Sequence, residues 1–267
     1  MKIIRHQTPS GPAYAALQPD GSAVEISGDI LGSFKTTGKV VTLVKILAPI
    51  VPPNILAIGL NYRRHAEEGG KGVPERPMLF IKSTNTLQNP GDPIEIPVKN
   101  ASTQVDWECE LAVVIGKTCK NATKANALSY VLGYTAANDV SSRDWQFALG
   151  GGQFCQGKSF DTFCPLGPVL VTPDEIPNPN ALRIKTIVKG QTMQDWSTDD
   201  MVFDVPTLIE FLSASKTLVP GTVILTGTPH GVGYARKPPV FLKAGDTVTI
   251  EIEKIGSLTN PVIDEKV

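Results

Sequence analysis

The pattern of apolar and polar positions along this chain predicts many short strands and few helices. Short runs of apolar and β-branched residues, bounded by glycine and proline, are typical of strands buried in a protein core. Beyond residue 52 this pattern predicts strands at residues 55–60, 78–82, 107–115, 131–137, 168–171, 182–189, 222–226 and 247–253.

Helices are predicted at residues 123–130, from residue 139 or 141 to 149, and at residues 206–213. A capping threonine at the first, three stopping glycines after the second and an early proline in the third support these bounds. Helices do not alternate regularly with strands, which argues against a doubly wound sheet. We therefore expect a mostly β chain of the α+β class, with a mixed or antiparallel β architecture and peripheral helices.

The first fifty residues differ from the remainder in the length and spacing of their apolar runs. Short strand-like pieces at residues 2–5, 13–17 and 23–26 are separated by glycine and proline, and Pro52-Pro53 follows this section. We predict a small N-terminal β domain at residues 1–51 and a main domain at residues 52–267, to which the candidate site residues below belong.

Composition narrows the class of protein. The chain has 267 residues, is 41% apolar and carries a formal net charge of −1, so it gives no sign of binding nucleic acid or a membrane surface. No apolar run is long enough to span a bilayer, and the first residues lack the pattern of a signal peptide. A cytoplasmic protein with reduced cysteines is expected, and three histidines with no Cys-x-x-Cys pair argue against structural zinc.

The segment from Asp106 to Gly116 carries the most informative chemistry. It begins with polar residues and continues as a buried apolar strand, in which Glu108 and Glu110 point to the same side. Two such carboxylates need a cation, a partner or water. Asp139 can supply a third oxygen, and three carboxylates suit Mg²⁺ first, then Mn²⁺ or Ca²⁺. The alternative is a solvent-facing pair at the end of a strand.

Two further polar residues are spaced to accompany Asp139. On the predicted helix, Arg143 and Gln146 follow Asp139 by four and then three residues, which places all three on one face. Arg143 and Gln146 can then hold a carboxylate or carbonyl group of an anionic ligand. The alternative is an ordinary ion pair on the helix surface.

Residues 152–159 match the phosphate-loop pattern G-x-x-x-x-G-K-S. That motif requires a strand before it and a helix after it, whereas here a helical segment precedes it and the residues that follow are poor helix formers. We therefore do not predict a nucleotide site. Lys158 is instead a candidate cation for an enolate or a substrate carboxylate, or else a solvated surface lysine.

His65 and Glu68 follow directly on the predicted strand at residues 55–60. Their spacing makes them neighbours on a helical turn, where a carboxylate raises the basicity of an imidazole and produces a general base. Glycines 69, 70 and 72 suggest a segment that moves as a lid. The alternative is a surface pair.

A glycine-rich turn follows the predicted strand at residues 222–226. Its sequence, Thr-Gly-Thr-Pro-His-Gly-Val-Gly, offers backbone amides and the Thr228 hydroxyl to an anionic group. The alternative is a tight turn dictated by glycine and proline.

Taken together, these segments resemble the fumarylacetoacetate hydrolase superfamily across roughly residues 52 to 255. The set comprises Gly-x-Asn-Tyr-x-x-His-x-x-Glu, Glu-x-Glu, Asn-Asp-Val-Ser-x-Arg-Asp-x-Gln, Gly-Lys-Ser-Phe-Asp-x-Phe-Cys-Pro-x-Gly-Pro and Thr-Gly-Thr-Pro-x-Gly-Val-Gly. The resemblance implies a mixed β-sandwich roll, a homodimer and a carboxylate-bound Mg²⁺. It also implies three groups of site residues: metal ligands Glu108, Glu110 and Asp139; an acid–base pair His65 and Glu68; and substrate-contacting residues Arg143, Gln146, Lys158 and Thr228.

The resemblance implies a small oxo-acid substrate but leaves the reaction open. We expect a 2-oxo acid of the β-diketo or oxaloacetate-like kind to chelate Mg²⁺, and a C–C bond to be cleaved by hydrolysis or decarboxylation through the resulting enolate. His65 would activate water, and Lys158 would stabilise the oxyanion. The alternatives are an isomerase or tautomerase of unsaturated hydroxy-diacids, and a non-catalytic module that binds a metal or ligand.

Overall fold

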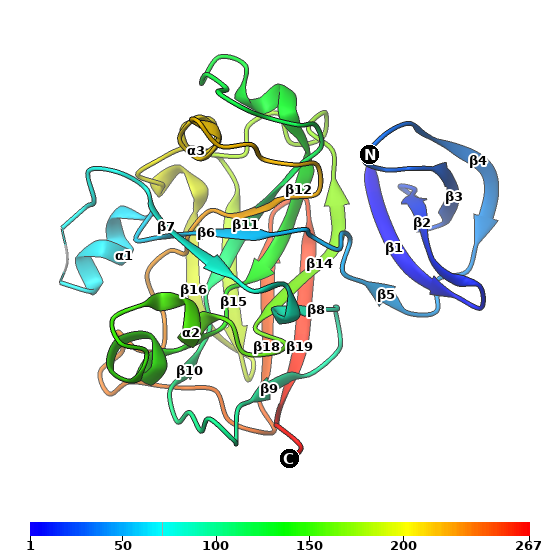
Figure 1. Ribbon diagram of the computed structural model, residues 1–267. Helices are drawn as coiled ribbons and strands as arrows, with labels where there is room; N and C mark the ends of the chain where they lie inside the picture. The colour runs from blue at the N-terminus through cyan, green and yellow to red at the C-terminus, as the bar shows by residue number, and fades with distance from the viewer. Residues whose placement is uncertain (71) are drawn as a thin grey trace.

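Strands dominate residues 1–70 and 72–267, which are the residues described by the structure, a computed structural model (Figure 1). In chain order they are β1 (Lys2–Thr8), β2 (Gly11–Leu17), β3 (Ala23–Gly28), β4 (Phe34–Val41), β5 (Ile46–Leu47), β6 (Ile55–Gly59), β7 (Met78–Lys82), β8 (Leu87–Gln88), β9 (Ile94–Ile96), β10 (Val105–Asp106), β11 (Cys109–Ile115), β12 (Val131–Asn138), β13 (Ser141–Ser142), β14 (Cys164–Val171), β15 (Arg183–Val188), β16 (Gln191–Ser197), β17 (Val223–Leu225), β18 (Thr247–Ile252) and β19 (Gly256–Asp264).

Helices are short and lie at the periphery of the sheets (Figure 1). They are α1 (Arg63–Glu68), α2 (Phe154–Lys158), α3 (Val205–Ser213), the 3₁₀-helices η1 (Thr84–Thr86), η2 (Ala127–Tyr130) and η4 (Thr198–Asp200), and the π-helix η3 (Trp145–Leu149). The predicted mostly β chain with peripheral helices is thereby confirmed.

The strands form one large sheet and two smaller ones within the described residues. The large sheet runs β4-β3-β2-β1-β14-β12-β11-β17-β6-β7, with β5 beside β1 and β8 beside β14. A five-stranded sheet has the order β16-β15-β18-β19-β9, and β10 pairs with β13. Because antiparallel and parallel pairs both occur in the large sheet, the mixed architecture expected from the sequence is present.

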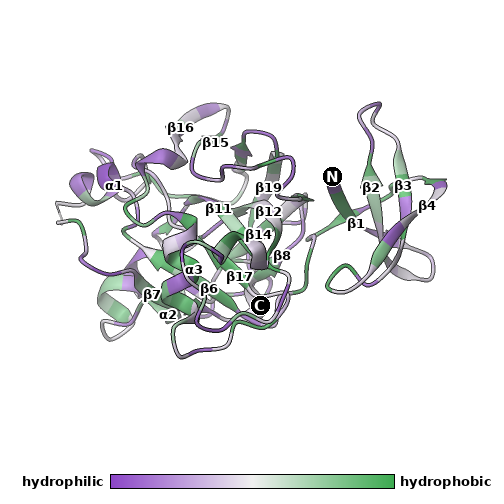
Figure 2. Cartoon of the chain, turned by 90° about the horizontal axis from the view of Figure 1, so that it is seen from above, coloured by the Kyte–Doolittle hydropathy of each residue, from purple (hydrophilic) through white to green (hydrophobic). Residues whose placement is uncertain are grey.

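The N-terminal strands β1 to β4 stand to one side of the main body (Figures 1 and 2). They form successive antiparallel pairs, and β1 joins the rest of the large sheet through β14, with Lys2 opposite Val171 and Ile3 opposite Leu170. A domain boundary near residue 52 stays a prediction.

The pairing of β11 with β12 positions the polar residues of interest. All seven residues of β11 are buried, and β11 lies between β12 and β17. In the antiparallel register Cys109 faces Asn138, so the residues that begin β11 lie beside those that end β12. This register brings Glu108 and Glu110 next to Asp139, although they are far apart in the sequence.

Two of the three predicted helices are shorter than expected. The 3₁₀-helix η2 covers the last four residues of the predicted helix at residues 123–130, and α3 confirms the helix at residues 206–213. The helix predicted from Asp139 begins only after β13. The Asp139 amide donates to the carbonyl of Glu108 and the Val140 amide to that of Phe163, so this stretch stays extended.

Candidate active site

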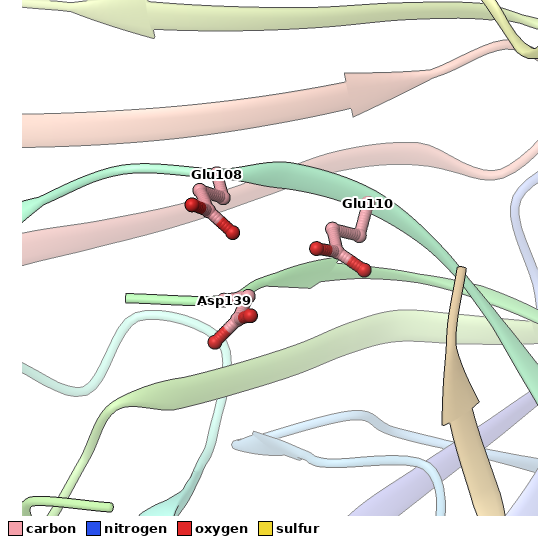
Figure 3. Close-up of side chains that lie close together, drawn as sticks. All are labelled: Glu108, Glu110 and Asp139. Atoms are coloured by element: carbon pink, nitrogen blue, oxygen red, sulfur yellow. The ribbon is translucent and has the colours of Figure 1, made fainter. Parts of the chain in front are cut away.

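Three carboxylates gather where the beginning of β11 meets the end of β12. Glu108 precedes β11, Glu110 lies on it, and Asp139 follows β12; their side chains point toward one another (Figure 3). One oxygen from each carboxylate lies within 4.8 Å of the other two, and all three residues are at most 5% exposed. The predicted set therefore converges, and the solvent-facing alternative for Glu108 and Glu110 is wrong.

Two buried lysines neutralise part of this cluster. Lys158 donates to Glu108 Oε2 at 2.8 Å and to Asp139 Oδ2 at 2.7 Å, and Lys82 donates to Asp139 Oδ1 at 2.6 Å. Burial alone would lower the pKa of Lys158, but Asp139 and Glu108 outweigh it and raise the pKa above its usual value. The surface-lysine alternative for Lys158 is therefore wrong.

Glu110 has a different environment from the other two acids. Its described partner is the backbone amide of Gly227, 2.7 Å from Oε2, and no salt bridge to Glu110 is formed among the described residues. Burial, Asp139 and Glu108 together raise the pKa of Glu110 well above its usual value. Among the described residues, Glu110 is thus the one acid of the three without a direct ion pair.

This donor set fits a hard divalent cation. Three carboxylate oxygens without histidine or thiolate are the ligands that Mg²⁺, Mn²⁺ and Ca²⁺ prefer, and the charge on Glu110 is the one that an added cation would balance. Lys158 contacts two of the three candidate ligands, so an ion bound there would share Glu108 and Asp139 with this lysine.

Arg143 forms the second polar part of the site. Its Nε donates to Asp106 Oδ2 at 2.9 Å, and its Nη1 lies 2.7 Å from Glu108 Oε1 and donates to Gln146 Oε1 at 2.9 Å. Its buried Nη2 has no hydrogen-bond partner among the described residues. Although Asp139 lies before β13 and only Gln146 lies within η3, the two residues and Arg143 belong to the same polar network, through Glu108 and Lys158. Arg143 is 4% exposed, so the surface ion-pair alternative is wrong.

His65 and Glu68 form the predicted pair on α1. Their atoms Nδ1 and Oε1 are 2.8 Å apart, and the second oxygen of Glu68 accepts from the Gly231 amide at 2.9 Å. The side chains are 15% and 20% exposed, which makes them partly accessible. The carboxylate fixes the orientation of the imidazole, as a general base requires. Residue 71 of the predicted lid lies outside the described residues.

The glycine-rich turn after β17 holds protein carboxylates. The amides of Gly227, Gly231 and Gly233 donate to Glu110, Glu68 and Asp106 respectively. The prediction that the glycine amides of this turn bind an anionic ligand is therefore wrong for all three, because a protein carboxylate already accepts from each one. Gly227 and Gly231 have φ of 96° and 97°, which glycine adopts readily.

Most of these groups line one cavity of about 180 Å³. Eight of the nine predicted site residues line it: His65, Glu68, Glu108, Glu110, Arg143, Gln146, Lys158 and Thr228. The ninth, Asp139, is fully buried against the two lysines beside this lining. The residues that match the phosphate-loop pattern include α2 at Phe154–Lys158. Among the described residues, the π-helix η3 precedes them where the motif requires a strand, and no helix follows them before β14.

Sequence reasoning missed three buried residues that support the site. Lys82 holds Asp139, Asp106 holds Arg143, and Gln194 donates to the Thr228 hydroxyl at 2.8 Å. Lys82 ends a strand that is otherwise apolar, and a lone lysine there is a usable signal because lysine is rarely buried without a partner. No local pattern distinguishes Gln194.

Two family models match this chain. Residues 54–263 match the family model described as fumarylacetoacetate (FAA) hydrolase C-terminal, and residues 1–49 match one described as Rv2993c-like, N-terminal. The chain belongs to the fumarylacetoacetate hydrolase family. The resemblance seen in the sequence is therefore confirmed, and the chain is an enzyme of this family.

Similar members of the fumarylacetoacetate hydrolase family have several names. The chain is 48% identical over 250 residues to the oxaloacetate tautomerase fahd2, mitochondrial, of Xenopus laevis, covering 93% of this chain and 75% of that protein. It is 47% identical over 221 residues to the human oxaloacetate tautomerase FAHD2A, mitochondrial, covering 82% and 70%. Both of these relatives are named as oxaloacetate tautomerases.

Solved structures of the family share the fold. A 5-carboxymethyl-2-hydroxymuconate delta-isomerase from Mycobacterium smegmatis has a TM-score of 0.87 and 40% identity, covering 99% of this chain and all of that chain. A fumarylacetoacetate hydrolase from Exiguobacterium antarcticum has a TM-score of 0.89 and 36% identity over the same shares. These likenesses confirm the predicted family fold.

Proposed function

We propose that this protein is a divalent-metal-dependent enzyme that acts on a small 2-oxo acid and cleaves a C–C bond by hydrolysis or decarboxylation. The observation that carries the proposal is a cavity whose lining contains both the buried acidic cluster and the His65–Glu68 pair. The first suits a cation that binds an oxo acid, and the second suits proton transfer beside it.

The residues of this chain divide the work as follows. When bound by Glu108, Glu110 and Asp139, a divalent ion supplies Lewis-acid stabilisation of negative charge on the 2-oxo oxygen. The free Nη2 of Arg143, supported by Gln146, binds the substrate carboxylate. Lys158 stabilises the oxyanion that develops as the bond breaks, and Thr228 contacts the remaining oxygen atoms.

His65 moves the proton in this mechanism. Held by Glu68 through Nδ1, it accepts a proton from water at Nε2, and the water oxygen adds to the second carbonyl of a β-diketo acid. The C3–C4 bond then breaks with its electron pair on C3, and C3 takes up a proton. Decarboxylation needs no water nucleophile, so it depends less on His65.

Tautomerisation is the second candidate, and the names of the oxaloacetate tautomerases favour it. It needs the same head-group binding and a proton transfer at C3, but no bond between carbons breaks. Isomerisation of an unsaturated hydroxy-diacid belongs to this candidate, because one structural relative is named for it.

An ultraviolet assay with acylpyruvates, oxaloacetate and an unsaturated hydroxy-diacid separates these reactions. Pyruvate and a carboxylate from acylpyruvate indicate hydrolysis, carbon dioxide from oxaloacetate indicates decarboxylation, and loss of the enol absorbance without cleavage indicates tautomerisation. Cleavage of none of the acids would contradict the first proposal, and enol turnover alone would establish the second.

Metal dependence has its own test. We expect Mg²⁺ to raise the melting temperature, because an ion that binds the native state stabilises it, and EDTA to abolish turnover. A melting temperature that does not respond to Mg²⁺, Mn²⁺ or Ca²⁺ would contradict the cofactor. A clear response without turnover of any acid would favour the non-catalytic binding module.

Assembly and location are part of the proposal. We propose a homodimer, since two-fold dimers are the commonest oligomers, and light scattering of the full chain measures it. No described helix is long and apolar enough to cross a membrane. Two relatives are named as mitochondrial proteins, and the cytoplasmic location that we propose for this chain is tested by fractionation of its own cells.

A further inference from the structure

The cavity has two unlike sides. One side carries the charged and polar groups that the proposed function uses. The other side consists of apolar and aromatic side chains, to which β6, β7, η3, α2 and the loop after residue 231 contribute: Ile58, Phe80, Phe147, Phe154, Val232 and Tyr234. We call the four aromatic residues of this set the aromatic wall.

The rings of the aromatic wall contact one another in sequence. Centroids of Phe80 and Phe154 are 5.8 Å apart, those of Phe154 and Phe147 are 6.2 Å apart, and those of Phe147 and Tyr234 are 5.2 Å apart. Phe80 is 8% exposed, whereas Phe147 and Tyr234 are 41% and 47% exposed. The wall therefore extends from a buried inner end to an accessible outer end.

The inner end of the wall meets the polar side at Lys158. The Lys158 Nζ lies 5.1 Å from the centroid of the Phe80 ring while it also holds Glu108 and Asp139. A substrate whose oxygen atoms reach Lys158 thus begins at the charged groups, and its remaining atoms extend along the rings.

The chemistry of the wall discriminates between substrate tails. A carboxylate placed against these rings would lose water and gain no ion pair from them, which is costly. An apolar or aromatic tail removes ring surface from water and can stack on the rings. Since the charges of Arg143 and Lys158 are used at the head of the substrate, the wall favours an uncharged tail.

We infer that the substrate is a 2-oxo acid whose part beyond C3 is an uncharged apolar group, aryl or bulky alkyl, and that the aromatic wall selects it. This inference rests on the proposed function for the position of the head group. It makes an aroylpyruvate a better substrate than oxaloacetate, which ends in a second carboxylate.

The cleavage of such a substrate balances without another reactant. Water adds its oxygen to the acyl carbonyl, the C3–C4 bond breaks with its electron pair on C3, and C3 takes up one proton. Benzoylpyruvate and water therefore give benzoate, pyruvate and one released proton.

Three substrates and one set of variants test the inference with the Mg²⁺-loaded full chain. The probes are benzoylpyruvate, acetylpyruvate and oxaloacetate. We expect kcat/KM for benzoylpyruvate to exceed the values for the other two by about tenfold or more, as hydrophobic pockets discriminate by such factors. In Phe147→Ala combined with Tyr234→Ala, the preference for benzoylpyruvate over acetylpyruvate should fall about tenfold.

Two further variants sharpen the result. Phe147→Lys adds a cation to the wall and should shift the preference toward oxaloacetate. Phe211→Ala removes a comparable, partly buried ring from α3, outside the cavity, and should leave the preference ratio as it is. Melting temperatures of all variants show whether a change in rate reflects loss of folding.

A binding measurement separates failure of the inference from failure of the proposed function. N-phenyloxamate and oxamate mimic a 2-oxo acid with and without an aryl tail, and calorimetry should give at least tenfold tighter binding of the former. Equal turnover of the acids, or preference for oxaloacetate, overturns the inference and leaves the proposed function intact. Absence of turnover with preserved preference for N-phenyloxamate overturns the proposed reaction and supports the wall.

Discussion

The acidic cluster and the His65–Glu68 pair line the same cavity but are built in opposite ways. The cluster extends from β11 and β12, in the middle of the large sheet, and its three members are at most 5% exposed. The pair lies on α1, a six-residue helix at the periphery, and it is partly exposed. One part is fixed by the core, whereas the other depends on a few hydrogen bonds.

This difference matches the two kinds of work that the site is proposed to do. Binding a cation requires oxygen atoms held at constant separation, and a sheet interior provides this. Proton transfer requires a group within hydrogen-bond reach of the substrate, and a short peripheral helix can bring one there once the substrate has bound. Variants in the two parts should therefore fail in different ways.

Glu110→Gln should have the largest effect on activity. Glu110 has no described cationic partner, so the amide keeps the shape of the side chain and breaks no ion pair. We expect folding without metal to be preserved, the Mg²⁺-dependent rise in melting temperature to disappear, and kcat/KM to fall about ten-thousandfold because several kcal/mol of Lewis-acid stabilisation are lost. Retained Mg²⁺ stabilisation in this variant would remove Glu110 from the metal site.

His65→Ala should come next and should separate the two parts. Loss of a general base costs about a thousandfold in kcat for hydrolysis of acylpyruvate, while Mg²⁺ still raises the melting temperature as in the unaltered protein. Decarboxylation of oxaloacetate should fall less, since it needs no activated water. An unaltered hydrolysis rate would show that another group is the base.

Glu68→Gln should reduce hydrolysis about a hundredfold. The amide still accepts from the Gly231 N–H, but it can donate to His65 Nδ1 and so favour the wrong tautomer of the imidazole. Because the hydrogen bond between residue 68 and Gly231 is kept, α1 stays in place. Changes in kcat and in the steady-state pH profile then report the altered tautomer of His65. Glu67→Gln, one position earlier on α1, is the matched control, and a loss of equal size there would mean that the helix itself is disturbed.

Arg63→Ala should have the smallest effect. The Arg63 Nη1 donates to the carbonyl oxygens of Asp200 and Met201 at 3.2 and 3.1 Å, contacts that hold the start of α1. Their loss is worth about 1 kcal/mol, so we expect at most about a fivefold fall in kcat/KM for hydrolysis and unaltered Mg²⁺ binding. A much larger fall would mean that α1 is held chiefly at this end.

The strand pattern allowed the fold class and the convergence of the three acids to be predicted. Alternation along a buried strand placed Glu108 and Glu110 on one side, and this holds because β11 is paired on both edges. The helix from Asp139 was wrong, because the hydrogen bonds that keep residues 139–142 extended come from distant strands. Long-range pairing of this kind leaves no local signal.

The sequence did not reveal the supporting roles of Lys82 and Gln194 for a related reason. Lys82 and Gln194 act through partners 57 and 34 positions away, so no spacing rule connects them with Asp139 or Thr228. The aromatic wall was missed as well, since Phe80, Phe147, Phe154 and Tyr234 come from four separate elements and each resembles an ordinary core residue in sequence.

The glycine-rich turn after β17 has a consequence for how the chain tolerates changes in length. Its amides at residues 227, 231 and 233 hold a candidate metal ligand, the partner of the imidazole and the partner of Arg143, the proposed substrate-binding arginine. The spacing of the three amides along the turn therefore matches the positions of three acids that belong to β11, α1 and β10. A one-residue insertion between Gly227 and Gly231 would instead put two of them out of step, so this stretch should accept substitutions of its outward side chains far more readily than any change in its number of residues.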